Sequence, residues 1–136
     1  MLKSFCEWLI QSGRLPDLVI GRTLYAGFWP QDTPNTATAI RELTGAYVDG
    51  YNRTLREIHY QIMTRAPSYQ AAEAEANRIF EVCVNLRGED LTGLISGEEW
   101  RIFTTTGIAP AYIPPQDEKG RFVFSSNITL HIKKET

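Results

Sequence analysis

Ile58-His59-Tyr60-Gln61-Ile62-Met63 is followed, after a break at Arg65-Ala66-Pro67-Ser68, by a helical pattern over residues 69–86. In the first part, Ile58, Tyr60 and Ile62 alternate with other residues, which predicts a strand with one buried face. In the second part, apolar residues recur at helical intervals: Tyr69, Ala72, Ala76, Ile79, Phe80, Cys83 and Leu86. This stripe predicts an amphipathic helix, so the segment reads as a strand–turn–helix unit.

Both ends of the predicted helix carry matching signals. The Ser68 hydroxyl can accept a hydrogen bond from the unpaired amides of the first turn, as a helix N-cap does. Gly88 suits the left-handed residue that follows a helix. No strand-breaking residue stands between Arg53 and Ile58. The preceding strand, predicted over residues 58–63, can therefore start as early as Arg53.

Further strands are expected around this unit. Residues 122–132 alternate so regularly that they predict a half-buried antiparallel strand, with Ser126 as the polar residue on its buried side. Shorter strands are expected at residues 18–24, 36–43, 100–106 and 108–113, and a first amphipathic helix at residues 2–9. Pro110 favours an edge position for its strand. The predicted fold is α+β: a mainly antiparallel sheet of about five to seven strands, with two α-helices packed on one face.

Length and composition are those of one globular domain spanning residues 1–136. The apolar fraction is 43% and the charged fraction 22%, and the net charge is -2. This charge gives no general reason to bind nucleic acid or an anionic membrane. Glu7 interrupts the first apolar residues, and no apolar run reaches transmembrane length, so we expect a soluble, intracellular protein.

The two cysteines, Cys6 and Cys83, each fall in the apolar stripe of a predicted helix. The simpler interpretation is that each is a small buried hydrophobic residue. A disulfide between them would require the two helices to pack closely, and the sequence leaves that alternative open.

Large aromatic residues occur in two segments that are predicted as loops or turns. Residues 26–35 contain two prolines and form a predicted loop that carries Phe28 and Trp29. Tyr47 and Tyr51 lie in a turn region between two glycines. Such side chains either form a small core under the loop or contact a partner, so all four are candidate subunit or partner contacts.

The motifs of common enzymes are absent from the sequence. Neither a phosphate-binding glycine loop nor a nucleophile elbow occurs. His59 and His131 lie on the polar sides of two predicted strands and could meet at a metal, but no third ligand is evident. Arg53, Arg56 and Arg65 are interpreted as a solvated basic edge. We therefore expect no catalytic residue, no cofactor site and no metal site.

A family resemblance is carried by an ordered series of short patterns. Thr36-Ala37-Thr38-Ala39-Ile40-Arg41-Glu42-Leu43-Thr44-Gly45 leads to the central strand, and Arg65 and Ser68-Tyr69 lead into the alanine-spaced helix. A Gly120-Arg121 turn then opens the long alternating strand. This succession, over nearly the whole chain, resembles the tail-terminator, or minor capsid, proteins of long-tailed bacteriophages.

The resemblance implies a structural virion protein with an α+β fold. Such a subunit would assemble into a ring, of six copies, that caps the tail tube and meets the head-completion protein. Its partners would be itself, the major tail tube protein and the head-completion protein, and DNA would pass through without specific binding. It would reside in the virion, and in the host cytoplasm during assembly.

Three other functions stay open at this point. The chain departs from the family pattern at Leu43-Thr44-Gly45, where paired glycines are typical, which is compatible with another neck or head–tail connector role. The functions from other classes are a small metal-dependent enzyme, using His59 and His131, and a nucleic-acid-binding module.

Overall fold

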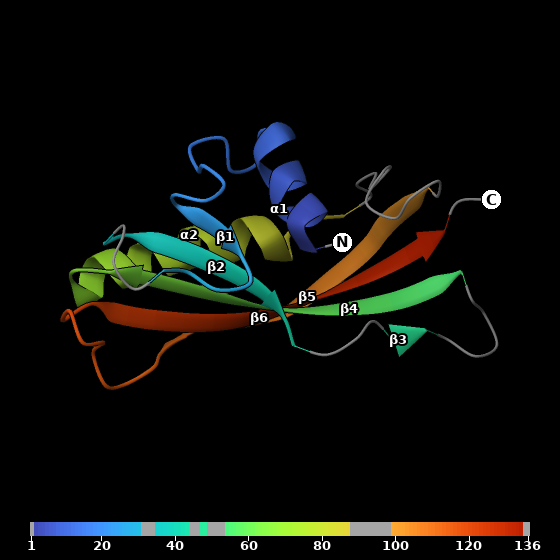
Figure 1. The fold of residues 1–136 in the computed structure, drawn as a ribbon. Helices are drawn as coiled ribbons and strands as arrows, with labels where there is room; N and C mark the ends of the chain where they lie inside the picture. The colour runs from blue at the N-terminus through green and yellow to red at the C-terminus, as the bar shows by residue number, and fades with distance from the viewer. Residues whose placement is uncertain (1, 31–34, 44–46, 49–53, 88–98, 135–136) are drawn as a thin grey trace.

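The computed structural model describes residues 2–30, 35–43, 47–48, 54–87 and 99–134 (Figure 1). Six strands form one sheet: β1 (Leu24–Ala26), β2 (Ala37–Glu42), β3 (Tyr47–Val48), β4 (Leu55–Ala66), β5 (Trp100–Tyr112) and β6 (Phe122–Lys134). Their order is β1-β2-β4-β6-β5, and β3 pairs with β4. All pairs are antiparallel except β1 with β2. The two helices are α1 (Leu2–Gln11) and α2 (Tyr69–Val84), which confirms the predicted α+β class.

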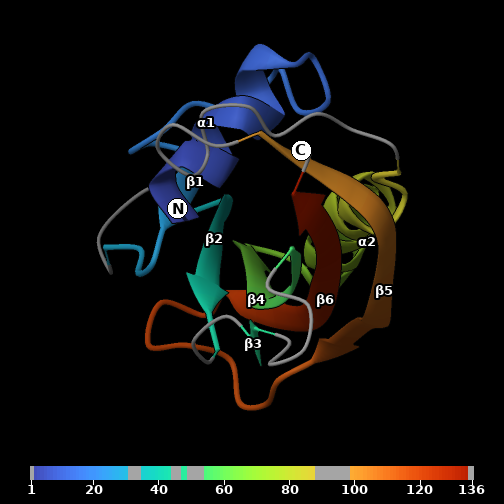
Figure 2. The same cartoon turned by 90° about the vertical axis from the view of Figure 1, so that its right-hand side faces the viewer.

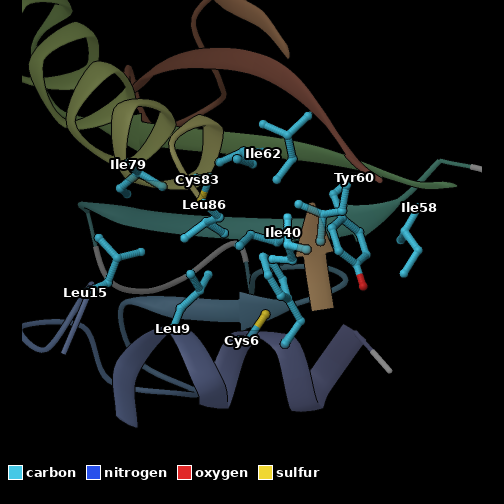
Figure 3. Close-up of a cluster of buried hydrophobic side chains, with 14 of the residues drawn as sticks. Cys6, Leu9, Leu15, Ile40, Ile58, Tyr60, Ile62, Ile79, Cys83 and Leu86 are labelled. Atoms are coloured by element: carbon cyan, nitrogen blue, oxygen red, sulfur yellow. The ribbon is translucent and has the colours of Figure 1, made fainter. Parts of the chain in front are cut away.

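Both helices cover the same face of the sheet. α1 lies against β1 and β2, whereas α2 lies against β4, β5 and β6 (Figure 2). Side chains from both helices and from five of the strands join in one buried cluster (Figure 3). The predicted packing of two helices on one face is therefore confirmed.

The pairing of β4 with β6 forms the centre of the sheet. It runs without interruption from Leu55 opposite Lys133 to Ala66 opposite Phe122. The strand predicted over residues 58–63 is thus longer at both ends, and Pro67, which has no amide hydrogen to donate, follows its last residue. Along β6, Ser126 is buried on the helix-covered side, as predicted.

Helix α2 begins as its sequence predicts and ends slightly earlier. The Ser68 hydroxyl accepts a hydrogen bond from the Ala71 amide at 3.1 Å, which confirms the N-cap. Asn85 is the C-cap, so Leu86 is buried just beyond the helix instead of within it. Gly88 lies outside the described residues. Along the helix, the buried residues are Ala72, Ala76, Ile79, Phe80 and Cys83.

The contacts of α1 explain why both cysteines are buried. Phe5 stacks on Tyr60 of β4 with ring centroids 5.0 Å apart, and this contact brings α1 onto the core. Cys6 and Cys83 are both fully buried free thiols in the same cluster. Burial raises the pKa of each thiol to about 12. The interpretation as small buried hydrophobic residues therefore holds.

The predicted strand at residues 18–24 is wrong over most of its length. The carbonyl oxygen of Val19 accepts from the amides of Thr23 and Leu24, which closes a turn, and only Leu24 enters β1. Gly21 has a φ of 80°, a conformation that glycine adopts without strain. The apolar residues of this segment are spaced as in a strand because Leu18 and Leu24, at the two ends of the turn, are both buried.

The two strands predicted at residues 100–106 and 108–113 are one strand, β5. Its pairing with β6 shifts twice, between Ile102 and Thr104 and between Ile108 and Ala111. Pro110 lies within the second shift, where the ladder does not need its missing amide hydrogen. The predicted edge position is confirmed, because β5 is the last strand of the sheet. The short strand β3 was not predicted, because two residues carry no periodic signal.

Gly107 allows α2 to approach β5 closely. A Cβ atom at this position would lie 2.8 Å from Phe80 Cε1 and 2.9 Å from the carbonyl oxygen of Asn127. We expect Gly107→Ala to lower the free energy of unfolding by about 1–3 kcal/mol, as overpacking does. Urea denaturation followed by circular dichroism measures this change. The control Ala109→Ser, at an exposed position of the same strand, should stay within about 0.5 kcal/mol, and equal losses in both variants would contradict the explanation.

Candidate functional site

The face of the sheet opposite α1 and α2, here called the open face, collects the polar residues of the central strands. Side chains alternate along a strand, so the residues between the buried ones point to this face. In β4 and β6 they include Glu57, His59, Gln61, Ser125, Asn127, Thr129 and His131. One end of the open face carries the loop after β1, and the other end carries the two histidines.

Arg65 anchors the loop that follows β1. Its guanidinium group is fully buried, donates to the Pro30 carbonyl oxygen at 2.7 Å and lies 4.7 Å from the Trp29 ring centroid. Burial lowers the pKa of Arg65, and the nearby guanidinium of Arg121 lowers it further. The described part of the loop is thus held against the sheet by a cation–π contact and a charged hydrogen bond.

The turn before β6 closes over the same region. Arg121 is buried, and its Nε donates to Asp117 Oδ2 at 2.7 Å while its backbone amide donates to Asp117 Oδ1 at 2.8 Å. Partial burial of the Asp117 carboxyl raises its pKa, but the hydrogen bonds from Arg121 and Lys119 outweigh this and hold the pKa below its ordinary value. The carboxylate therefore keeps its charge beside the buried arginines.

The interpretation of the arginines as a solvated edge is therefore wrong for Arg65, because the chain returns over it at two places. Arg56 is only half-exposed, and its guanidinium lies 4.7 Å from the Trp100 ring centroid. Arg53 lies outside the described residues. Alternation along β4 places Arg65 on the open face, but it does not show that a loop and a turn cover it there.

The structure places the four candidate contact residues in different settings. Trp29 is half-buried on Arg65, whereas Phe28, its neighbour, is 77% exposed with the Arg41 guanidinium 5.9 Å from its ring centroid. Tyr47 belongs to β3, opposite Glu57, and Tyr51 lies outside the described residues. The loop therefore divides its two aromatic residues, one inward and one outward.

We expect Trp29→Ala to destabilise the fold by about 1–3 kcal/mol. The truncation removes the aromatic surface over the buried Arg65 guanidinium and opens it to water. The adjacent Phe28→Ala variant is a matched control and should change stability by less than about 0.5 kcal/mol, since Phe28 is largely exposed. Thermal and urea unfolding of the two variants test this. Similar losses of stability in both would show that the contact of Trp29 with Arg65 contributes no more than the exposed Phe28 ring does.

The two histidines do come together, and a carboxylate lies between them. His131 Nδ1 is 3.4 Å from Glu57 Oε1, and His59 Nε2 is 3.7 Å from Glu57 Oε2. His59 Nδ1 is 3.0 Å from Thr129 Oγ1, a hydrogen bond across the strands. Sequence reasoning missed Glu57, because its position opposite His131 depends on the register of β4 with β6. Within the described ranges, no group of three His, Cys, Asp or Glu residues is placed to hold a metal ion.

A shallow groove of about 540 Å³ runs beside this cluster on the open face. Leu43 and Ile108 line it as exposed apolar residues, 44% and 68% exposed. The polar side chains in its lining are His59, Thr106, Asn127 and Thr129. Its lining thus combines apolar and hydrogen-bonding groups, a mixture that protein–protein interfaces also contain.

Neither helix in the described residues has the length and apolar character needed to cross a bilayer.

Comparison with known proteins identifies the family. A family model described as bacteriophage tail terminator protein matches residues 14–134. No curated protein matches the chain. The matched segment contains α2 and all six strands of the sheet, and thus the loop, the histidine cluster and the groove. Because the match covers most of the chain and the complete sheet, the protein belongs to the bacteriophage tail terminator family.

Proposed function

We propose that the protein forms a ring of six copies that caps the tail tube, stops its growth and joins it to the head-completion protein. The observation that carries this proposal is the family match over residues 14–134. That match makes the chain a structural component of a phage tail. The ring, its size and its neighbours are the proposed part.

Two surface features support assembly into a ring. A ring requires contacts between two different patches of identical subunits. Phe28 presents a largely exposed aromatic ring, a type of side chain enriched at interfaces. Trp29, Tyr47 and Tyr51 remain proposed contacts as well. In addition, β5 is an edge strand, and such an edge can pair with a neighbouring chain.

The proposed partners are further copies of the chain, the major tail tube protein and the head-completion protein. DNA would pass through the ring, and we expect the isolated protein to retain little of it at physiological salt, because its net charge is -2. We expect no cofactor and no catalysis. The proposed location is the tail or neck of the virion, with the host cytoplasm as the place of assembly.

Deleting the gene from the phage or prophage that carries it tests the proposal. Electron microscopy should show tails of irregular and excessive length that lack heads, and supplying the chain in trans should restore uniform, joined tails. Native mass spectrometry of the purified protein, or of protein released from tails, should show a closed ring. Tails of normal length that merely lack heads would instead indicate another neck role. Normal tails together with the absence of any ring would overturn the proposal.

A further inference from the structure

We propose that Asp117 positions the loop that carries Phe28. It does so by holding two buried arginines, Arg121 and Arg65, through which the loop is joined to the sheet. Asp117 lies in the turn before β6, far from the loop along the chain, so no local contact accounts for this role. The role goes beyond the proposed ring, and only its effect on assembly rests on that ring.

The loop after β1 is held at two points, one on each side of Phe28. Before Phe28, the Gly27 amide donates to a carbonyl oxygen of β2 at 2.7 Å. After it, the Arg65 guanidinium donates to the Pro30 carbonyl oxygen at 2.7 Å and lies 4.7 Å from the Trp29 ring centroid. The outward direction of Phe28 therefore depends on where Arg65 lies.

The Asp117 carboxylate lies at the centre of its own turn. Its Oδ2 accepts from Arg121 Nε at 2.7 Å, and its Oδ1 accepts from the Arg121 and Lys119 amides at 2.8 and 3.0 Å. The turn is closed by the Gly120 amide, which donates to the Asp117 carbonyl oxygen at 2.9 Å. Asp117 is thus the first member of a series of neighbours, in which Arg121 follows it and Arg65, which binds the loop, follows Arg121.

The charges explain why this series acts as one unit. Burial lowers the pKa of Arg65, and the neighbouring guanidinium of Arg121 lowers it further. The Asp117 carboxylate and, to a smaller extent, the Tyr25 side chain favour the charged form of Arg65 instead. Neutralising Asp117 would therefore remove an attraction on Arg65 and leave the repulsion by a second buried cation in place. A displaced Arg65 would release the loop.

Asp117→Asn tests this role, because it keeps the shape of the side chain and removes its charge. The Asp117 side chain is 26% exposed, so the variant should fold. At a concentration where the protein is monomeric, hydrogen exchange of the Gly27 amide should become about ten- to hundredfold faster, the effect of losing a hydrogen bond to a charged group. NMR measures this rate relative to that of the Ile79 amide in α2, which reports on the stability of the whole fold.

A second substitution shows whether the charges carry the effect. Arg121→Met fills a similar volume without a charge, so in the Asp117→Asn background it removes the repulsion that acts on Arg65. The relative exchange of Gly27 should then return to within about threefold of that in the unmodified protein, as replacing a buried ion pair by apolar groups permits. A turn that only loses its structure without Asp117 would not recover, because a further buried contact has been removed.

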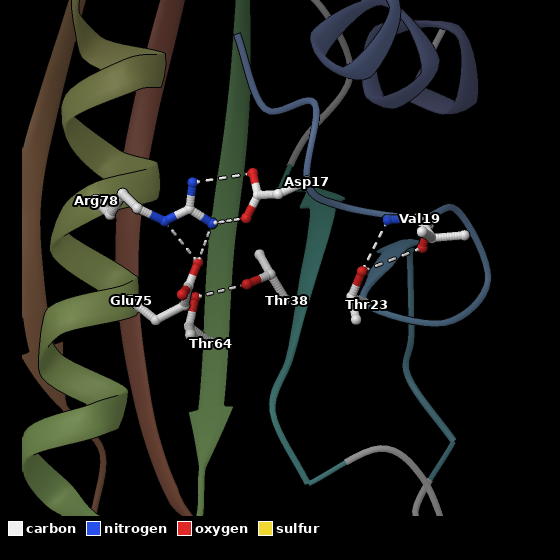
Figure 4. A network of polar contacts seen from close by, with 7 residues as sticks. All are labelled: Asp17, Val19, Thr23, Thr38, Thr64, Glu75 and Arg78. Atoms are coloured by element: carbon white, nitrogen blue, oxygen red, sulfur yellow. Dashed lines mark hydrogen bonds and ion pairs between the residues drawn. The ribbon is translucent and has the colours of Figure 1, made fainter. Parts of the chain in front are cut away.

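Two other carboxylates provide matched controls. Glu118→Gln removes the charge next to Asp117 in the same turn, from an exposed side chain. Asp17→Asn removes a carboxylate whose two oxygens accept from the Arg78 guanidinium of α2, at 3.2 and 2.9 Å (Figure 4). Both variants should leave the relative exchange of Gly27 within about twofold, since Glu118 is exposed and Asp17 binds Arg78 instead of the buried arginines.

Ring assembly is the second measurement. Only subunits whose loop is in place present Phe28 correctly, so Asp117→Asn should weaken assembly about three- to tenfold as the fraction of such subunits falls. Glu118→Gln should change assembly by less than about twofold. Sedimentation velocity over a range of protein concentrations measures both variants.

The outcomes separate this role from the proposed ring. If the relative exchange of Gly27 is unchanged in Asp117→Asn, or does not recover with Arg121→Met, the positioning role is wrong whether or not rings form. Faster exchange together with unimpaired assembly would overturn the role of Asp117 in assembly. If the exchange rates respond as expected but neither the purified protein nor tails contain a ring, Asp117 positions the loop and the proposed function is wrong.

Discussion

Replacing Ile79 by alanine should lower the free energy of unfolding by about 2–5 kcal/mol. Ile79 is fully buried in the cluster shared by α1, α2 and the sheet (Figure 3). The truncation removes apolar surface from this cluster and leaves a cavity that the surrounding strands cannot close. Urea denaturation followed by circular dichroism, fitted to a two-state transition, measures the loss.

Two companion variants make this measurement specific. Ile79→Val, which removes one methyl group, should cost about 0.5–1.5 kcal/mol. Asn77→Ala, at an exposed position of the same helix, should stay within about 0.5 kcal/mol. If Ile79→Ala is no more destabilising than Asn77→Ala, α2 does not pack on the sheet as described. Phe80→Ala should behave like Ile79→Ala, since its ring lies close to Gly107.

Phe28→Asp should abolish ring assembly and leave the fold intact. The side chain is largely exposed in the single subunit, so the melting temperature should not change measurably. If Phe28 is buried between subunits in the proposed ring, an aspartate at this position brings an unpaired charge into the contact, which costs several kcal/mol. Native mass spectrometry of the variant, and the tail lengths that it restores in a deletion strain, measure the effect.

The matched control for Phe28→Asp is Phe28→Tyr, which keeps the aromatic ring and should assemble normally. Trp29→Asp is less informative than Phe28→Asp, because Trp29 contacts the buried Arg65 and its replacement should disturb the fold as well. Tyr51→Asp remains a prediction of lost assembly with an intact fold. Normal rings from Phe28→Asp would exclude Phe28 as a subunit contact.

Local periodicity accounts for the parts of the fold that were predicted correctly. The alternation in β6 and the apolar stripe of α2 each repeat several times along the element. The buried face of each can therefore be predicted from its own sequence, without knowing which element packs against it. Ser68 is equally local, because an N-cap bonds an amide only three residues away. The pairing of these elements in one sheet then follows from burying their apolar faces together.

Residues that interact through strand register or through a returning loop were not predictable in this way. Glu57 meets His131 only because β4 and β6 pair in one particular register. The sequence pattern placed Arg65 at an exposed edge, yet it is buried because Trp29 and the turn at Asp117 come back over it. Neither contact leaves a periodic trace in the sequence around it.

The sequence by itself determined the fold class, the central strand, the long helix and the family, because these depend on patterns read within one segment or in order along the chain. Only the tertiary structure decided that residues 19–24 form a turn and that Phe28 and Trp29 face opposite ways. It alone also brought Leu43 and Ile108 to the two walls of one groove. The turn is closed by local hydrogen bonds, but the burial of Leu18 and Leu24 gives it the apolar spacing of a strand. The groove and the orientation of the two loop aromatics join residues far apart in the chain, and local periodicity does not contain which distant side chains cover a residue.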